Sequence, residues 1–132
     1  GTASAGFRQK GAEMPTDRFV TTITLPWPPS KLSRNGPQAD YSGKARSARL
    51  YRSDALVCAL RDARGVTVSG PIMLDITFHA PDNRRRDLDN LLAMTKQGID
   101  AIAEVLKVDD YSFEYTLRRG VVSKGGKVIV RI

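Results

Sequence analysis

The residues best suited to chemistry lie in one stretch, 81–90, which reads PDNRRRDLDN. Its carboxylates Asp87 and Asp89 are two positions apart, so both point to the same side if the segment is extended. Two such charges about 4 Å apart repel each other by roughly 1 kcal/mol in water and about 4 kcal/mol near a protein surface. A Mg²⁺ ion relieves this repulsion, because it prefers oxygen ligands and commonly takes one or two carboxylates plus phosphate oxygens. The spacing therefore predicts a metal site on Asp87 and Asp89.

Three consecutive basic residues, Arg84, Arg85 and Arg86, directly precede these carboxylates. A guanidinium group binds phosphate oxygens through two parallel hydrogen bonds. Phosphate-binding arginines beside cation-binding carboxylates indicate phosphodiester chemistry on a nucleic acid. The structural alternative is that an Asp or Asn in this stretch only caps the helix that follows, and that the arginines form solvated surface.

The composition of the chain agrees with a nucleic-acid partner. Its 132 residues, 41% of them hydrophobic, are enough for one domain with a real core. The formal net charge is +7 and the isoelectric point is about 9.9, which suits a polyanion better than an acidic protein or a small apolar ligand. A basic protein without a nucleic-acid role is the alternative that charge alone leaves open.

Cysteine and histidine usage excludes several other kinds of site. The chain has one cysteine, Cys58, and one histidine, His79, so an internal disulfide, a Cys/His zinc cluster and a histidine-rich metal site are all excluded. No apolar run reaches the length of about 18 residues that spans a bilayer. We expect a cytoplasmic, nucleoid-associated protein of a bacterial or phage-infected cell, with residues 1–18 as a disordered leader or expression remnant and 19–132 as the domain.

Hydrophobic periodicity predicts four strands and two main helices. The strands are expected over 19–25, 72–80, 113–122 and 127–132, and the helices over 44–64 and 88–107. This β-α-β-α-β-β order predicts an α+β domain whose helices pack on a mixed sheet. The segment 123–126 predicts a hairpin between the last two strands. Asp75 alternates with the apolar positions of its strand, and we expect it at the surface.

The second predicted helix carries a lysine on the same face as Asp89. Because helical side chains lean toward the N-terminus, Lys96 would reach back toward a phosphate held near Asp87 and Asp89. The alternative is a surface ion pair between Lys96 and Asp100, four residues on.

Two further groups of charged residues lie outside that helix. Asp109 and Asp110 follow it, and either fold back toward Asp87 or stay solvated in a turn. Lys124 and Lys127 flank the predicted hairpin turn, where they contact backbone phosphates or remain solvated.

With these motifs in place, the chain resembles the RusA family of Holliday-junction resolvases. The matching segments follow the family order: 25–30 (LPWPPS), 81–90 (PDNRRRDLDN), 99–102 (IDAI), 109–110 (DD) and 124–126 (KGG). Together they cover the chain from about Phe19 to its end. The run of arginines followed by Asp-Leu-Asp-Asn is specific, and the Pro-Trp-Pro-Pro segment strengthens it.

The resemblance implies a RusA-like homodimeric endonuclease that binds four-way DNA junctions. Such an enzyme makes paired symmetric nicks with Mg²⁺ or Mn²⁺ and leaves 5′-phosphate ends. The family's metal-binding aspartates map onto Asp87, Asp89 and Asp110, with Asp109 as the alternative for the third.

The family's catalytic lysine and its basic loop map less directly. The lysine position one turn after Asp89 holds Ala93 here, and aligning segment 99–102 assigns the lysine to Lys96 instead. Lys31 and Arg34 resemble the family's DNA-binding loop only loosely.

Two other functions fit the same residues. One is a metal-dependent nuclease of broader specificity that cuts forks or flaps. The other is a structure-specific DNA-binding protein without catalysis, in which the acidic residues only cap a helix.

Overall fold

The computed structural model describes residues 19–33 and 41–132. Its helices are α1 (Tyr41–Ala63), α2 (Leu88–Met94) and α3 (Lys96–Leu106), with short 3₁₀ turns η3 (Ser30–Leu32) and η4 (Asp110–Ser112). Its strands are β2 (Thr22–Pro26), β3 (Ile72–His79), β4 (Phe113–Arg119) and β5 (Lys127–Arg131). The α+β class and the predicted element order are confirmed. Residues 1–18 and Arg34 lie outside the described part of the chain.

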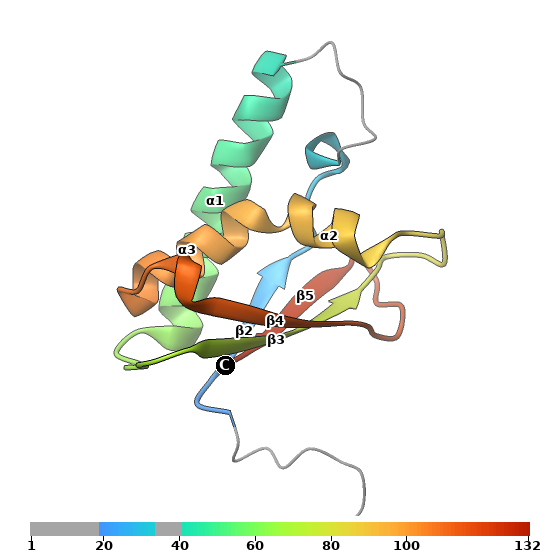
Figure 1. Ribbon diagram of the computed structural model, residues 1–132. Coiled ribbons are helices and arrows are strands. Elements are labelled where there is room, and N and C mark those ends of the chain that lie inside the picture. Colours follow the sequence, from blue (N-terminus) through green and yellow to red (C-terminus); the bar gives the residue numbers. More distant parts are fainter. Residues whose placement is uncertain (1–18, 34–40) are drawn as a thin grey trace, which may run out of the picture.

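The four strands form one mixed sheet in the order β2-β5-β3-β4 (Figure 1). Strand β5 pairs antiparallel with both β2 and β3, whereas β3 and β4 are parallel. The predicted hairpin between the last two strands is therefore wrong. Strand β3 lies between β4 and β5, so the segment after β4 must cross the end of β3 before β5 begins.

The core lies between the sheet and the helices on one of its faces (Figure 1). Leu74, Ile76 and Val130, whose side chains point to this face, are fully buried. Alanines of α1 also pack there, because Ala55 and Ala59 have no exposed surface. None of the described helices is long and apolar enough to cross a lipid bilayer.

Helix α3 lies close to β2 and α1 at Gly98. A Cβ atom at this glycine would lie 3.0 Å from Leu25 Cδ1 and 3.2 Å from Tyr51 Cε2. The Tyr51 hydroxyl in turn donates a hydrogen bond of 2.7 Å to the Pro26 carbonyl at the end of β2. This close packing of α1, α3 and β2 fixes the end of the sheet from which segment 27–33 departs.

The predicted helix 88–107 is broken into two helices at Thr95. The backbone of this residue has φ −92° and ψ 0°, and its buried hydroxyl donates to the Leu91 carbonyl over 2.8 Å. A threonine that bonds back to the preceding turn competes with the regular helical ladder and bends a helix. Lys96 is thus the first residue of a new helix, and a straight-helix distance from Asp89 does not apply.

The two outer strands of the sheet differ in how their edges are closed. On β2, Asp62 of α1 accepts a hydrogen bond from the Thr24 N–H over 2.9 Å, and Arg61 donates to the Thr24 carbonyl over 3.0 Å. An ion pair of 2.7 Å joins Arg61 and Asp62. These side chains occupy backbone groups that another strand would otherwise bind. Strand β4 forms the opposite edge, and five of its seven residues are exposed.

The expectation that Asp75 lies at the surface is wrong. Only 7% of this residue is exposed, on the sheet face opposite the helices. Arg118 of β4 forms an ion pair of 2.6 Å with its Oδ2 atom, while Oδ1 is buried and has no hydrogen-bond partner within the described structure. Alternation correctly assigned Asp75 to the other face, but Arg118 lies across that face and covers the carboxylate.

Candidate active site

Asp87 stands where the loop after β3 enters α2, and its carboxylate is exposed. It occupies the N-cap position with extended backbone angles, φ −83° and ψ 137°, yet its side chain makes no capping hydrogen bond. The capping role that competed with the metal-site interpretation is therefore not performed by this side chain. Both of its oxygens are available to a cation, and carboxylate oxygens suit Mg²⁺.

Asp89 lies in the first turn of α2 and is also exposed. The extended segment on which the same-side prediction relied includes Asp87 but not Asp89. A carboxylate in the first helical turn is favoured by the helix dipole, and this supplies part of the reason for acidic residues here.

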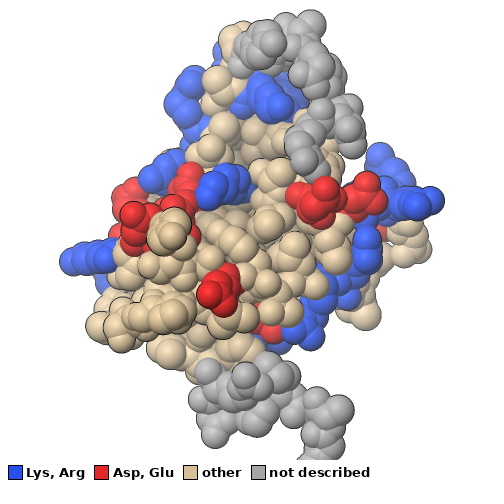
Figure 2. Space-filling view, in the orientation of Figure 1, with Lys and Arg blue, Asp and Glu red and all other residues tan. Residues whose placement is uncertain are grey.

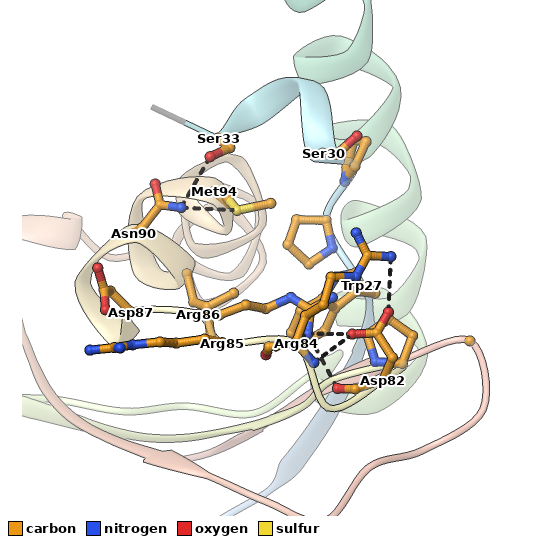
Figure 3. Close-up of a pocket in the computed structure, with 15 residues that line it drawn as sticks. Trp27, Ser30, Ser33, Asp82, Arg84, Arg85, Arg86, Asp87, Asn90 and Met94 are labelled. Atoms are coloured by element: carbon orange, nitrogen blue, oxygen red, sulfur yellow. Dashed lines mark hydrogen bonds and ion pairs between the residues drawn. The ribbon is translucent and has the colours of Figure 1, made fainter. Parts of the chain in front are cut away.

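The partly buried side chain of Arg86 binds other residues of the loop between β3 and α2. Its side chain is only 21% exposed and forms an ion pair of 2.9 Å with Asp82 Oδ1. Its guanidinium also donates to the carbonyls of Asp82 and Arg84, over 3.3 and 3.2 Å, and lies 5.5 Å from the centre of the Trp27 ring (Figure 3). A cation over an aromatic face contributes about 0.5–1 kcal/mol or more once desolvated. We call Asp82, Arg86 and Trp27 the loop latch.

The other two arginines remain available to a ligand. The Arg84 side chain is 81% exposed, although it also contacts Asp82 Oδ2 over 3.1 Å. Arg85 is exposed and makes no ion pair within the described residues. The three arginines therefore divide into one that stabilises the loop and two that can reach a phosphate.

A cleft of about 770 Å³ opens beside Asp87. Apolar side chains form one part of its wall, and charged side chains of the loop form another (Figure 3). The apolar part comprises Trp27, Pro28, Pro29, Leu91 and Met94, and the charged part comprises Asp82, Arg84, Arg85, Arg86 and Asp87. The amide of Asn90 crosses the cleft wall to donate to Ser33 Oγ over 3.1 Å, which ties α2 to the segment after η3. Such a mixed cleft suits a nucleotide, which has an apolar base and an anionic phosphate.

The lysines of segment 124–127 lie near the same loop. Gly126 packs against the latch, because a Cβ atom there would lie 2.8 Å from Trp27 Cγ and 3.0 Å from Pro81 Cδ. Lys124 is exposed in this turn, and Lys127 is exposed at the start of β5. Lys31 is exposed in η3, across the Pro-Trp-Pro-Pro segment.

Lys96 belongs to a second acidic group, formed with Asp100 and Asp110. Its Nζ atom lies 2.8 Å from Asp110 Oδ2 and 3.5 Å from Asp100 Oδ1. The hydrogen bond with Asp110 raises the pKa of Lys96, and it also holds the pKa of the Asp110 carboxyl below its ordinary value. Lys96 is therefore a permanent cation at neutral pH and not a proton acceptor.

Asp109 and Asp110 have different roles at the start of η4. The Asp109 carboxylate accepts a hydrogen bond of 2.9 Å from the Tyr111 N–H, so it caps this turn. Asp110 faces Lys96 and remains the candidate for the third metal ligand.

The three proposed metal ligands do not meet within one chain. Among the described residues, no three acidic, histidine or cysteine side chains lie close enough together to hold one ion. Figure 2 shows the acidic side chains of this face in separate groups, with mostly uncharged surface between them. A groove of about 380 Å³ lies between α2, α3 and β4, and it is lined by Asp89, Lys96 and Tyr115 among others.

Two contributors to the site were missed by sequence reasoning. Trp27 lies against the Arg86 guanidinium and meets Phe78 edge-on, with 6.4 Å between the two ring centres. Tyr115 borders the groove beside Asp89, and nothing in the pattern of its strand indicates this. The Pro-Trp-Pro-Pro motif was the one available signal for Trp27.

Comparison with known proteins adds sequence relatives to this geometry. No protein-family model matches the chain. The crossover junction endodeoxyribonuclease RusA of Escherichia coli K12 is 30% identical over 113 residues, which cover 84% of this chain and 92% of that protein. The rusA crossover junction endodeoxyribonuclease of Enterobacteria phage 82 is 30% identical over 83% of this chain and 91% of its own length. An uncharacterized protein of Xylella fastidiosa is 32% identical over 86% and 76% of the two chains. The chain belongs to the RusA family.

Proposed function

We propose that this protein is a Mg²⁺-dependent endodeoxyribonuclease that resolves four-way DNA junctions by paired symmetric nicks. The observation that carries the proposal is the Asp87 carboxylate, which is exposed and makes no capping hydrogen bond. It lies in the same loop as the exposed Arg84 and Arg85. Relatives named crossover junction endodeoxyribonucleases match this chain over more than nine-tenths of their own length, which supports the choice of substrate.

Asp87, Asp89 and Asp110 would hold the Mg²⁺ ion, and Mn²⁺ would substitute for it. When bound, the ion would acidify a water molecule and stabilise negative charge on the scissile phosphate. Arg84 and Arg85 would position the DNA backbone while the loop latch keeps Asp87 in place. Lys96, as a permanent cation, would neutralise charge that develops on the phosphate.

A homodimer explains how separate acidic groups can form one site. Asp87, Asp89 and Asp110 form no group of three within the described residues of one chain, so a second copy can supply a carboxylate to each site. A two-fold dimer would also present two equivalent sites to the two-fold junction. Its formal charge, twice +7, would make binding to a polyanion strongly salt-dependent.

The proposal is tested by cleavage of a mobile four-way junction, a fork and a plain duplex. We expect paired nicks in the junction with Mg²⁺ or Mn²⁺, and binding without cleavage when a chelator is added. Equal cutting of the fork and the junction would instead identify a broader-specificity nuclease of branched DNA. Junction binding with no cleavage under any metal condition would identify a non-catalytic DNA-binding protein.

A further inference from the structure

The cleft beside Asp87 is enclosed by segments that are distant in sequence. Its side chains come from segment 27–33 after β2, from the loop between β3 and α2, and from α2 itself (Figure 3). Asp87 is one of the residues that line it. A phosphate held by a cation on Asp87 would therefore place the nucleotide attached to it in the cleft or directly beside it.

Contacts between side chains fix the walls of this cleft. The Arg86 guanidinium lies 2.9 Å from Asp82 Oδ1 and 5.5 Å from the centre of the Trp27 ring, so the loop is fastened to segment 27–33. On the other side, the Asn90 amide donates to Ser33 Oγ over 3.1 Å and fastens α2 to the same segment. The cleft is thus formed before a ligand arrives, and binding there requires little further ordering of the protein.

The lining of the cleft suits the two parts of a nucleotide separately. Its apolar wall includes Met94, Leu91 and Pro29. Nucleobases that have left a helical stack bind such surfaces, and aromatic rings or guanidinium groups, through their flat faces. The exposed Arg84 and Arg85 line the same cleft and can bind the adjoining phosphates.

An intact duplex cannot use the apolar wall in this way. Its base faces are covered by the neighbouring base pairs, so a protein meets only base edges, sugars and phosphates. The wall gains a partner of matching chemistry only if one nucleotide leaves the stack. That step costs free energy in paired DNA and costs least where the base is already unpaired. At a branch point the strands change partners, so the stack is interrupted there.

We propose that this cleft takes one unstacked base of the strand being cut, next to the scissile phosphate, and thereby favours branch points over paired duplex. The inference rests on the proposed function in one respect, namely that the scissile phosphate is held at Asp87. Entry of the base into the cleft does not itself require cleavage, so the two proposals can be tested apart.

Removal of the base beside the cut tests whether the cleft needs it. The cut position is first mapped on a mobile junction, and junctions of fixed sequence are then made with a normal or an abasic nucleotide on either side of it. We expect the abasic nucleotide on one side to slow single-turnover cleavage at least about tenfold, because the stacking contact is lost. An abasic nucleotide is more flexible than a normal one, so a site that required flexibility alone would cut it equally fast or faster.

A variant that fills the cleft tests the location. Ser30 is exposed and lines the cleft, so Ser30→Leu places a branched side chain there. We expect this variant to cut the normal junction as slowly as the abasic one, which reduces the tenfold ratio to near one. Its junction affinity should fall far less, because phosphate contacts dominate binding. The matched control is Ser53→Leu at an exposed position of α1, which should keep the full ratio.

A binding assay in chelator supplies a measurement that does not depend on cleavage. A plain duplex with one unpaired nucleotide should bind at least about tenfold more tightly than the same duplex with an abasic nucleotide in that place. Ser30→Leu should lose this difference, and Ser53→Leu should retain it.

The outcomes separate the base-binding cleft from the nuclease. Equal cutting of normal and abasic junctions on both sides of the cut, or an unchanged ratio in Ser30→Leu, would overturn the cleft proposal and leave the nuclease proposal intact. Preference for the unpaired base in chelator, by a protein that cuts no junction with any metal ion, would uphold the cleft proposal and reject the nuclease.

Discussion

Among single residues, Asp87 contributes most to the proposed chemistry. Its position between β3 and α2 would normally give its carboxylate a capping role, yet the side chain makes no such hydrogen bond. The neighbouring latch explains how an exposed loop keeps this residue in place, because Arg86 is bound on several sides by Asp82, Arg84 and Trp27.

Removing the charge of Asp87 separates cleavage from binding. We expect Asp87→Asn to abolish junction cleavage while junction affinity is unchanged or higher, because the variant loses a metal ligand and a charge that repels phosphate. The same result is expected for Asp89→Asn and Asp110→Asn, and a smaller effect for Asp109→Asn, whose carboxylate caps η4. Gel-shift and nicking assays on one junction measure both quantities. Cleavage by Asp87→Asn at the unaltered rate would remove it from the metal site.

Lys96 is expected to act in catalysis more than in binding. Loss of one charge-stabilising group typically lowers a rate by about 10²–10³-fold, so we predict a decrease of this size in single-turnover cleavage by Lys96→Ala. Junction affinity should fall much less, since many phosphate contacts remain. Adding Ala93→Lys tests whether the position one turn after Asp89 can replace it. A normal rate for Lys96→Ala would leave Lys96 only its ion pairs with Asp100 and Asp110.

The latch should make the stability of the fold depend on acidic pH through Asp82. Hydrogen bonding to Arg86, aided by the Arg84 N–H, lowers the pKa of Asp82 from 3.8 to about 2. A carboxylate whose folded pKa is depressed stabilises the fold above its unfolded pKa, and this contribution is lost as the pH falls from about 4 to about 2. We expect Asp82→Asn to have a flatter dependence of its urea midpoint on pH over this window. Asp54→Asn, at an exposed position on α1, should keep the slope of the unaltered protein.

At the scale of elements, the turn before β5 packs against Trp27 and the loop between β3 and α2. Gly125 and Gly126 both have positive φ, 76° and 73°, but only Gly126 lies against Trp27 and Pro81. Replacement of either glycine by alanine costs about 1–2 kcal/mol in backbone strain.

The contact at Gly126 should add to that strain. Crowding against Trp27 costs about a further 1–3 kcal/mol, so Gly126→Ala is expected to unfold at lower urea than Gly125→Ala. It should also weaken the Arg86–Trp27 contact, which tryptophan fluorescence reports. Equal unfolding midpoints for the two variants would mean that the close contact is relieved at no cost.

Local patterns predicted the elements well, and contacts between distant residues explain the failures. Alternation in β3 depends only on near neighbours, and the burial of its apolar positions was confirmed. The hairpin failed because turn residues at 123–126 say nothing about which strand β5 joins. The helix break at Thr95 depends on the hydrogen bond of one hydroxyl group. A threonine can also occur in the apolar stripe of an unbroken helix, so its presence did not indicate the break.

The charged residues of the candidate site could be identified from the sequence, but their contacts with residues distant in the sequence could not. The charged motif 81–90 identified Asp87 and the exposed arginines directly. That Arg86 turns inward depends on Trp27, more than fifty residues away in sequence. The partner of Lys96 depends on where η4 packs, so its ion pair with Asp110 could not be predicted from the motif.

At the scale of the whole molecule, mixed dimers distinguish shared sites from separate ones. If Asp110 serves the second copy, a dimer of Asp87→Asn with Asp110→Asn contains one doubly altered site and one intact site. We expect the mixture to nick one strand of a junction, although each variant alone is inactive. No nicking by the mixture, under conditions where subunit exchange is shown, would mean that each chain builds its own site.

The side chains that cover the β2 edge affect whether further strands can add to the sheet there. A sheet with two open edges can add copies at both ends and extend into a filament, as edge strands tend to do. Here the side chains of Arg61 and Asp62 bind the backbone N–H and C=O of Thr24, so the middle of the β2 edge is not available to another strand. These two side chains would oppose the addition of a further strand along β2, as charged groups on edge strands do in other proteins.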